Sequence, residues 1–589
     1  MESSIAHKAH LKGSEFLLKD SPVADTLSIS DLTEEHHMIK QTVDQFVNDR
    51  VLPNAQRIDK QEEGLSVRLM EEIGELGLLA AHMPENYGGM QMDFISNSLI
   101  AEGMGAAGAF SVCYNAHTGI GMLPILYFGT ETQKQHYLPK LSSGEWKAAY
   151  CLTEPNSGSD ALSAKTRADL NEAGTHYNVT GQKMWISNAG FADVFILFAQ
   201  IDGDKFTGFI VDKGTEGMTL GAEEDKLGIK GSSTRQVFFE NALIPKENIL
   251  GEIGKGHLIA FNVLNIGRYK LGVSCLGGAK RMLREAANYS LERKQFKTSI
   301  SNFGAIKFKL AESAIRIDAL ESSIFRAAGL MDARINTLKE EGVDFGASKL
   351  QTAEEYALEC SIIKVLGSEN LDYVVDEAVQ VFGGMGYSEE GVAARAYRDS
   401  RINRIFEGTN EINRLLMVNL LFKKALKGEF DIASTAMKIQ SDLMSGTETE
   451  NFDEFKYADE RKAVASFKKI LFMLLGYAGQ KSMAKEINLK EAQEPVMNIS
   501  DIIIDIFAAE SLLLKTEKEA ASDVNTAILK TFFYDASARI QKNALDATGS
   551  MVDESMFGAF IGSIKKLTKY PMQNVMKHRR LIADNYLAR

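Results

Sequence analysis

A glutamate next to a glycine, Glu407 in the stretch YRDSRINRIFEGTNEINR (397–414), is the residue that best fits a catalytic group in this chain. A carboxylate works as a general base when it is withdrawn from water, because lost solvation raises its basicity. Gly408 would let the backbone bring this carboxylate close to another molecule. Taken alone, such a glutamate is more often a surface acid or a carboxylate at a helix N-terminus.

Other stretches combine glycines with aromatic, hydroxyl and basic side chains. Glycines permit close backbone approach, and an arginine fork such as Arg293 suits a pyrophosphate. The ordinary alternatives are a solvated helix charge for Arg293 and a core aromatic on a strand for Trp185. The stretches are AAYCLTEPNSGSDA (148–161), GQKMWISNAG (181–190), ERKQF (292–296) and QVFGGMGY (380–387).

Several common catalytic motifs are absent from the sequence. It has no GxxxxGK[ST], no GxGxxG between a strand and a helix, no HExxH and no GxSxG. The four cysteines, Cys113, Cys151, Cys275 and Cys360, lie far apart and form no cluster with metal-ligand spacing. We therefore expect no metal site, and reduced thiols in a cytoplasm rather than a disulfide framework.

The composition is that of a globular protein with several structural units. The chain is 45% hydrophobic and 25% charged, an ordinary globular composition. Its 589 residues are too many for a single hydrophobic core. The net charge of −13 argues against a broad nucleic-acid surface. The first thirty residues lack the apolar core of a signal peptide, and no apolar run approaches the roughly 20 residues that cross a bilayer. We expect a cytoplasmic protein.

The hydrophobic pattern divides the chain into four units. Residues 31–150 show helical periodicity, while 151–251 hold short β-rich runs such as HYNVTGQKMWI, separated by Gly, Asp and Asn. Helical periodicity returns over 252–427 and again over 428–589. The predicted class is α+β, with a compact antiparallel β domain between helical units.

Together, these motifs resemble the acyl-CoA dehydrogenase family over about residues 31–420, in the family's order. The resemblance implies an N-terminal helical domain, a central antiparallel β domain, a C-terminal four-helix bundle and an FAD cofactor. The additional helices of 428–589 resemble the longer subclass that includes very-long-chain acyl-CoA dehydrogenase and its relative in complex I assembly.

The activity implied by the resemblance is α,β-dehydrogenation of a long-chain acyl-CoA in fatty acid β-oxidation. Electrons would pass to an electron-transfer flavoprotein. Two alternatives remain open: an acyl-CoA oxidase, which reduces O₂, and a scaffold or assembly protein that retains the fold. Intact Glu407, Thr153 and Trp185 argue against pure scaffolding.

The resemblance gives each motif residue a role around Glu407. Glu407 would remove the substrate's α-proton while the β-hydride passes to the flavin, and its backbone amide would help form the oxyanion hole. Arg268 would meet the adenosine end of CoA, with Asn265 one helical turn earlier. Further substrate-binding residues are Phe406, Gly408 and Ser159, and further cofactor-binding residues are Thr409 and Glu411.

The flavin site implied by the resemblance draws on two subunits. From one subunit come Tyr150, Leu152, Thr153, Ser159, Trp185 and Ser187. From its neighbour come Arg293, Gln295, Phe296, Gln380, Gly383 and Gly384. Gly304 and Lys307 depart from the family, because many relatives carry glutamines there on the adenosine side.

The additional helical unit contains a basic and apolar segment. Arg461, Lys462, Lys468, Lys469 and Lys481 lie on either side of ILFMLLGY within 461–481, which has no acidic residue. Such a segment predicts peripheral contact with an anionic membrane; packing of residues 470–475 into the unit's own core is the alternative. We also expect a homodimer, because this unit would cover the surface by which shorter relatives pair dimers into tetramers.

Overall fold

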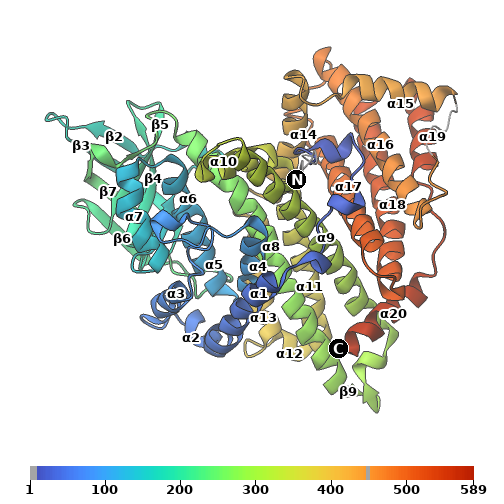
Figure 1. Cartoon of the computed structure of the whole chain (residues 1–589), viewed down its shortest axis with the longest axis horizontal. Coiled ribbons are helices and arrows are strands. Elements are labelled where there is room, and N and C mark those ends of the chain that lie inside the picture. Colours follow the sequence, from blue (N-terminus) through green and yellow to red (C-terminus); the bar gives the residue numbers. More distant parts are fainter. Residues whose placement is uncertain (1–9, 446–450, 589) are drawn as a thin grey trace, which may run out of the picture.

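The computed structural model describes residues 10–445 and 451–588 and has the α+β class predicted from the sequence. The β domain and the N-terminal helices lie at one end, a bundle of long helices occupies the middle, and the additional helical unit covers the other end (Figure 1). The first nine residues, part of the segment searched for a targeting signal, lie outside the described residues.

The N-terminal helices begin at polar capping residues. Thr33 and Thr130 each accept a backbone N–H at 3.2 Å, and Asp93 accepts one at 2.7 Å, so three of the helices start where a side chain satisfies a free N–H. A π-helical segment, Ala116–Gly121, separates two of them. The helices are α1 (Glu34–Phe46), α2 (Ala55–Asp59), α3 (Leu65–Glu75), α4 (Phe94–Gly105), α5 (Ala109–Asn115), α6 (Leu123–Phe128) and α7 (Glu131–Ser143).

The β domain is one sheet in the order β6-β7-β3-β2-β4-β5-β8, with β1 paired to β4. Most pairs are antiparallel, but β4 runs parallel to β1 and to β2, which corrects the expectation of a wholly antiparallel sheet. After the β2–β3 hairpin the chain crosses over and β4 returns alongside β2, as a parallel pair requires. The strands are β1 (Ala148–Cys151), β2 (Arg167–Leu170), β3 (His176–Ser187), β4 (Val194–Ile201), β5 (Lys205–Asp212), β6 (Met218–Glu223), β7 (Thr234–Pro245) and β8 (Ile249–Leu250).

The central bundle depends on close helix crossings at glycines. A Cβ atom on Gly367 would lie 2.7 Å from the Cα of Gly272, so α8 and α11 cross backbone to backbone. The helices are α8 (Gly256–Glu292), α9 (Gly304–Glu340), α10 (Phe345–Glu355), α11 (Ala357–Phe382), α12 (Gly384–Tyr387), α13 (Val392–Ser400) and α14 (Asn410–Leu426), and the small hairpin β9 (Lys294–Gln295) and β10 (Thr298–Ser299) follows α8.

The additional unit is helical and packs directly on this bundle. Its helix α17 lies against α9 and α14, and its last helix contacts α9. Lys307 of α9, one of the departures from the family pattern, forms an ion pair with Asp584 of that last helix. The helices are α15 (Ala433–Ser445), α16 (Ala458–Met483), α17 (Gln493–Lys518), α18 (Asp523–Met551), α19 (Phe557–Leu567) and α20 (Val575–Leu587).

The basic segment 461–481 lies within α16, and its apolar side chains are not available to a membrane. Ile470, Leu471, Phe472, Leu474 and Leu475 are at most 1% exposed and belong to the core. Three of the predicted membrane-binding cations have acidic partners instead: Arg461 pairs with Glu517, Lys468 with Glu510 and Lys481 with Asp553. The structure therefore supports the alternative, in which residues 470–475 pack into the unit's own core, and membrane contact through 461–481 stays a prediction. None of the helices among the described residues has the length and apolarity to span a bilayer.

Candidate active site

Glu407 lies in a short loop just before α14, in a backbone conformation that residues other than glycine rarely adopt. Its φ is 57° and that of Gly408 is 79°, both in the left-handed region. Thr409 then caps α14 by accepting the N–H of Ile412 at 3.2 Å. A Cβ on Gly267 of α8 would lie 2.7 Å from the Oε2 of Glu407, so only glycine leaves room for this carboxylate. Strain of this kind concentrates at functional sites.

The electrostatics of Glu407 are those of a base that works near neutrality. Burial raises its pKa to about 7, against the opposing effect of the positive charges of Arg268, Lys364 and Lys270. Its Oε2 atom is buried and has no hydrogen-bond partner among the described residues. A carboxylate held without a partner beside a glycine can accept a proton from a bound molecule.

Arg268 supports this loop from behind. Its Nε donates to the backbone carbonyl of Glu407 at 3.2 Å, and its Nη1 donates to Asn265 at 2.8 Å. Arg268 and Asn265 are 7% and 8% exposed. The sequence placed Arg268 at the adenosine end of CoA, with Asn265 one helical turn earlier. In the structure the Arg268 guanidinium is buried and bonded to the loop carbonyl.

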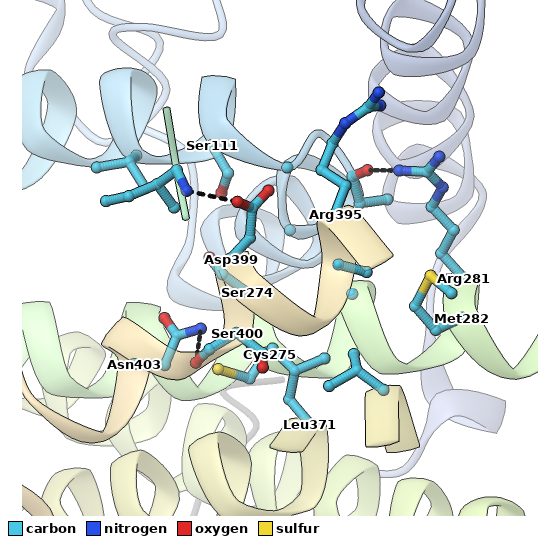
Figure 2. A pocket seen from close by; sticks show the side chains of 18 of the residues that line it. Ser111, Ser274, Cys275, Arg281, Met282, Leu371, Arg395, Asp399, Ser400 and Asn403 are labelled. Carbon is cyan, nitrogen blue, oxygen red and sulfur yellow. Dashed lines mark hydrogen bonds between the residues drawn. The ribbon is translucent and has the colours of Figure 1, made fainter. Parts of the chain in front are cut away.

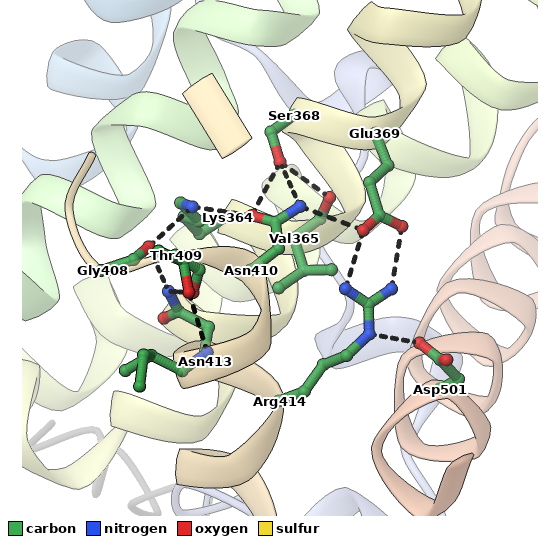
Figure 3. A network of polar contacts seen from close by, with 11 residues as sticks. Lys364, Val365, Ser368, Glu369, Gly408, Thr409, Asn410, Asn413, Arg414 and Asp501 are labelled. Atoms are coloured by element: carbon green, nitrogen blue, oxygen red, sulfur yellow. Dashed lines mark hydrogen bonds and ion pairs between the residues drawn. The ribbon is translucent and has the colours of Figure 1, made fainter. Parts of the chain in front are cut away.

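A polar network that sequence reasoning missed holds the other side of the loop (Figure 3). Lys364 of α11 donates to the Gly408 carbonyl at 2.8 Å and to the Asn410 side chain at 2.7 Å. Asn410 also donates to Glu369 at 3.0 Å. Lys364 is fully buried, and burial lowers its pKa to about 8. The only sequence signal was a lone lysine in the apolar run SIIKVLG.

The same network reaches the additional helical unit. Glu369 accepts two bonds from Arg414, at 2.7 and 2.9 Å. Arg414 in turn donates to Asp501 of α17 at 2.7 Å (Figure 3). The hydroxyl of Ser500 donates to the Arg414 carbonyl at 2.6 Å. The additional unit thus contacts the helix that follows the glutamate loop.

The residues predicted to surround a flavin ring lie at the end of β1 and along β3. The N–H of Met184 donates to the Thr153 carbonyl at 2.9 Å, which joins the two segments. Trp185 is 59% exposed, with φ at 57°, where the pairing of β3 and β7 shifts register. Burial and, to a smaller extent, the charge of Glu407 raise the pKa of Tyr150, whose buried hydroxyl has no partner among the described residues.

These residues fit a planar ring cofactor. Trp185 is exposed at a strained bulge and offers a surface on which a ring can stack. Tyr150 offers a polar contact through its unpaired hydroxyl. Leu152 and Ser187 are half-buried in the same two segments, and Phe406 is half-buried beside Glu407. Ser159 is exposed in the loop after β1.

The candidates assigned to a neighbouring subunit gather at one end of the bundle. The rings of Tyr289 and Phe382 stack with centroids 4.3 Å apart, which brings the end of α8 beside the end of α11. Phe296 is 90% exposed. Arg293, Gln295, Gln380, Gly383 and Gly384 are also exposed. The structure therefore brings the two motifs together on an open surface, as a contact with a second copy would require.

A cavity of about 100 Å³ lies where three parts of the fold meet, and Glu407 does not line it (Figure 2). Asp399 accepts the N–H of Ile229 from the β domain, and burial raises the pKa of Asp399 to about 6. Arg281 donates to the Ala106 carbonyl of the N-terminal helices at 2.9 Å. These contacts join the domains around the site and add no group to its chemistry.

Comparison with known proteins agrees with this fold and site. Four models match in chain order: the N-terminal domain of acyl-CoA dehydrogenase (33–145), its middle domain (149–242), its C-terminal domain (254–421), and a second acyl-CoA dehydrogenase C-terminal domain (466–566). The fold is that of an acyl-CoA-handling oxidoreductase with an added helical unit. The chain belongs to the acyl-CoA dehydrogenase family, as its motifs predicted.

Two relatives match almost the whole chain. A probable acyl-CoA dehydrogenase of Bacillus subtilis (strain 168) is 46% identical over 97% of this chain and 96% of its own length. The solved acyl-CoA dehydrogenase complexed with FAD from Bacillus anthracis is 46% identical, with a TM-score of 0.95 over 98% of this chain and 99% of its own. Human very long-chain specific acyl-CoA dehydrogenase is 37% identical over 63% of this chain and 57% of its own length.

The raised pKa of Glu407 predicts how catalysis depends on pH. Burial favours the neutral form, so the carboxylate that accepts a proton predominates only above about pH 7. Below that value kcat/KM should fall about tenfold per pH unit, because kcat/KM reports the ionisation of the base in the free enzyme. Initial rates between pH 5 and pH 9 check this. An acid limb with its midpoint near the usual glutamate value, about 4.3, would contradict a buried base.

Proposed function

We propose that the chain catalyses the α,β-dehydrogenation of an acyl-CoA to the trans-2-enoyl-CoA. The observation that carries the proposal is the carboxylate of Glu407, whose Oε2 atom is buried and unpartnered among the described residues and whose pKa is raised to about 7. The α-hydrogen of a thioester is weakly acidic, so its removal needs a desolvated base and prompt stabilisation of the enolate oxygen. The N–H of Glu407 donates to no described protein group, and we assign it to that oxygen.

FAD is the cofactor that we propose for this site, and when bound it supplies the acceptor for the hydride that leaves the β-carbon. Tyr150, Leu152, Thr153, Trp185 and Ser187 would hold it. On the protein side, Glu407 takes the α-proton, while Arg268 and Lys364 keep the loop in place through the carbonyls of Glu407 and Gly408. The Bacillus anthracis relative, described as complexed with FAD, supports this assignment.

We further propose that electrons leave to an electron-transfer flavoprotein and that the reaction belongs to fatty acid β-oxidation, in a cytoplasm. The four cysteines are all buried and unpaired, which fits a reducing compartment. The long acyl chain predicted from the sequence is supported by the 37% identity with the very long-chain human enzyme. It stays a prediction, because no contact in the site measures chain length.

The proposed function is tested by mixing purified protein with acyl-CoAs of graded length in the absence of oxygen. We expect a yellow protein whose flavin absorbance bleaches within seconds. Oxygen consumption without an added acceptor would instead indicate an acyl-CoA oxidase. A protein that carries flavin yet bleaches with no acyl-CoA of any length would refute the dehydrogenase and favour a scaffold.

Arg293→Ala should weaken FAD retention and dimerisation together. Arg293 is exposed at the end of the bundle, beside the Gln380–Gly384 loop, where we propose that it meets the flavin of a second copy. Loss of a ligand that binds only the folded protein also lowers thermal stability. Flavin content, light scattering and melting temperature check this, with exposed Lys339→Ala as the control. A variant with parental flavin content and dimer population would count against the shared site.

A further inference from the structure

A second cavity lies next to Glu407, among the N-terminal helices and the bundle. From α8 it is lined by Ile266, Tyr269 and Lys270, which flank Gly267, the glycine pressed against the Glu407 carboxylate. Helices α4, α6 and α10 provide other walls. Lys270 is close enough to Glu407 for its charge to lower the pKa of that carboxyl. The cavity therefore lies beside the base, because both border the same turn of α8 around Gly267.

Two lysines place positive charge in this cavity. Lys270 donates to the Thr118 hydroxyl at 2.9 Å, and Lys349 donates to the His82 carbonyl at 3.0 Å. Lys349 is 6% exposed and lies 4.2 Å from the Phe345 ring centroid. An ammonium carries three N–H donors. Each lysine thus gives one hydrogen bond to a protein oxygen, and neither forms an ion pair with any described residue.

The two carboxylates whose charges act on Lys349 are bonded to other groups. Asp332 accepts the N–H of Phe94 at 3.0 Å, and Asp93 accepts the N–H of Ser96 at 2.7 Å and pairs with His36. The Nε2 of His82, also in the cavity wall, has no partner among the described residues. Burial lowers the pKa of Lys349 to about 7 and that of Lys270 to about 8. Charges of Asp332 and Asp93 act on Lys349, and that of Glu407 acts on Lys270, but no described carboxylate lies within ion-pair distance of either lysine. An anion that entered here would therefore be favoured.

We propose that this cavity binds a carboxylate at the far end of the acyl chain, so that the preferred substrates are ω-carboxyacyl-CoAs. The inference rests on the proposed function, which places the reacting carbons at Glu407. Apolar walls such as Phe94, Leu123 and Ile266 suit methylene groups, and the two ammoniums suit the terminal anion. A plain methyl end would leave both charges uncompensated against hydrocarbon.

The short separation along α8 favours a short or medium chain. Lys270 follows Gly267 by three residues, about 4.5 Å along a helix axis. A carboxylate that reaches Lys270 from the reacting carbons therefore needs a short or medium spacer. This opposes the long-chain expectation from the sequence, and one substrate series decides between the two.

The test compares adipyl-, suberyl- and sebacyl-CoA with hexanoyl-, octanoyl- and decanoyl-CoA on the flavin-loaded enzyme without oxygen. We expect the ω-carboxyl member of at least one pair to bleach the flavin about tenfold or more efficiently than its methyl partner. Lys349→Met and Lys270→Met should each reduce or reverse that preference. Exposed Lys427→Met, at the end of α14, is the control and should keep it. Flavin content and melting temperature confirm that the variants are folded.

Each outcome separates this inference from the proposed function. If every methyl-ended substrate matches or exceeds its ω-carboxyl partner, the inference is overturned while the dehydrogenase stands. If neither series bleaches the flavin, the proposed function itself fails. Inhibition by inorganic phosphate or acetate as strong as that by free adipate would reveal a general anion site and would also overturn the inference.

Discussion

A Glu407→Gln enzyme is expected to keep its flavin and its affinity for acyl-CoA while losing nearly all turnover. The amide has the shape of the carboxylate but cannot accept the α-proton. Removal of a general base costs about 10²–10⁴-fold or more. The substitution also relieves a buried, unpartnered carboxylate, so the melting temperature should not fall. Anaerobic flavin bleaching measures the loss of turnover, and the shift of the flavin spectrum on binding measures the retained affinity for acyl-CoA.

Glu429→Gln is the matched control, because Glu429 is exposed just beyond α14 and has no part in the site. It should bleach at the parental rate. Turnover by Glu407→Gln within tenfold of the parent would show that another group takes the proton. The charged groups that act on Glu407, Arg268, Lys270 and Lys364, are all cationic, so such a result would require a different geometry for the bound substrate.

The base and the flavin-facing residues were predictable because local motifs carry them. A glutamate before a glycine, and a tryptophan at a strand bulge, occupy conformations that their own neighbours in the sequence determine. The structure adds a reason that the motif does not state: Gly267, 140 positions earlier, leaves the space for the carboxylate. The fold class followed from periodicity, since the change from helical to β patterning is strong at both borders of the sheet.

Pairings between distant segments were not predictable. The charges of 461–481 looked unpaired, because Glu510, Glu517 and Asp553 come 42 to 72 positions after their partners, beyond the end of α16. The segment's composition matched a membrane-binding helix, yet its apolar face packs into the unit's core. The role of Arg268 was hard to predict for a similar reason. Its type suited a nucleotide, while its position on α8 turned it toward the Glu407 carbonyl.

Lys364→Met is expected to slow turnover by about 10- to 100-fold without loss of flavin. Lys364 links α11 to the Gly408 carbonyl and is one of its links to Asn410, and methionine fills similar space with no donor. The Glu407–Gly408 backbone is left-handed and needs such anchoring. Displacement of a base by about 1 Å can lower the rate roughly 10²-fold.

The substitution also removes a positive charge that lowers the pKa of Glu407. The base should therefore stay protonated to higher pH, and the acid limb of kcat/KM should move upward. A merely structural role would lower the rate and leave this limb in place. Lys423→Met, exposed on α14, should change neither rate nor pH profile. If Lys364→Met keeps the parental pH profile and a rate within twofold, Arg268 alone suffices to hold the loop, and the network from α11 to Asp501 serves only to dock the additional helical unit.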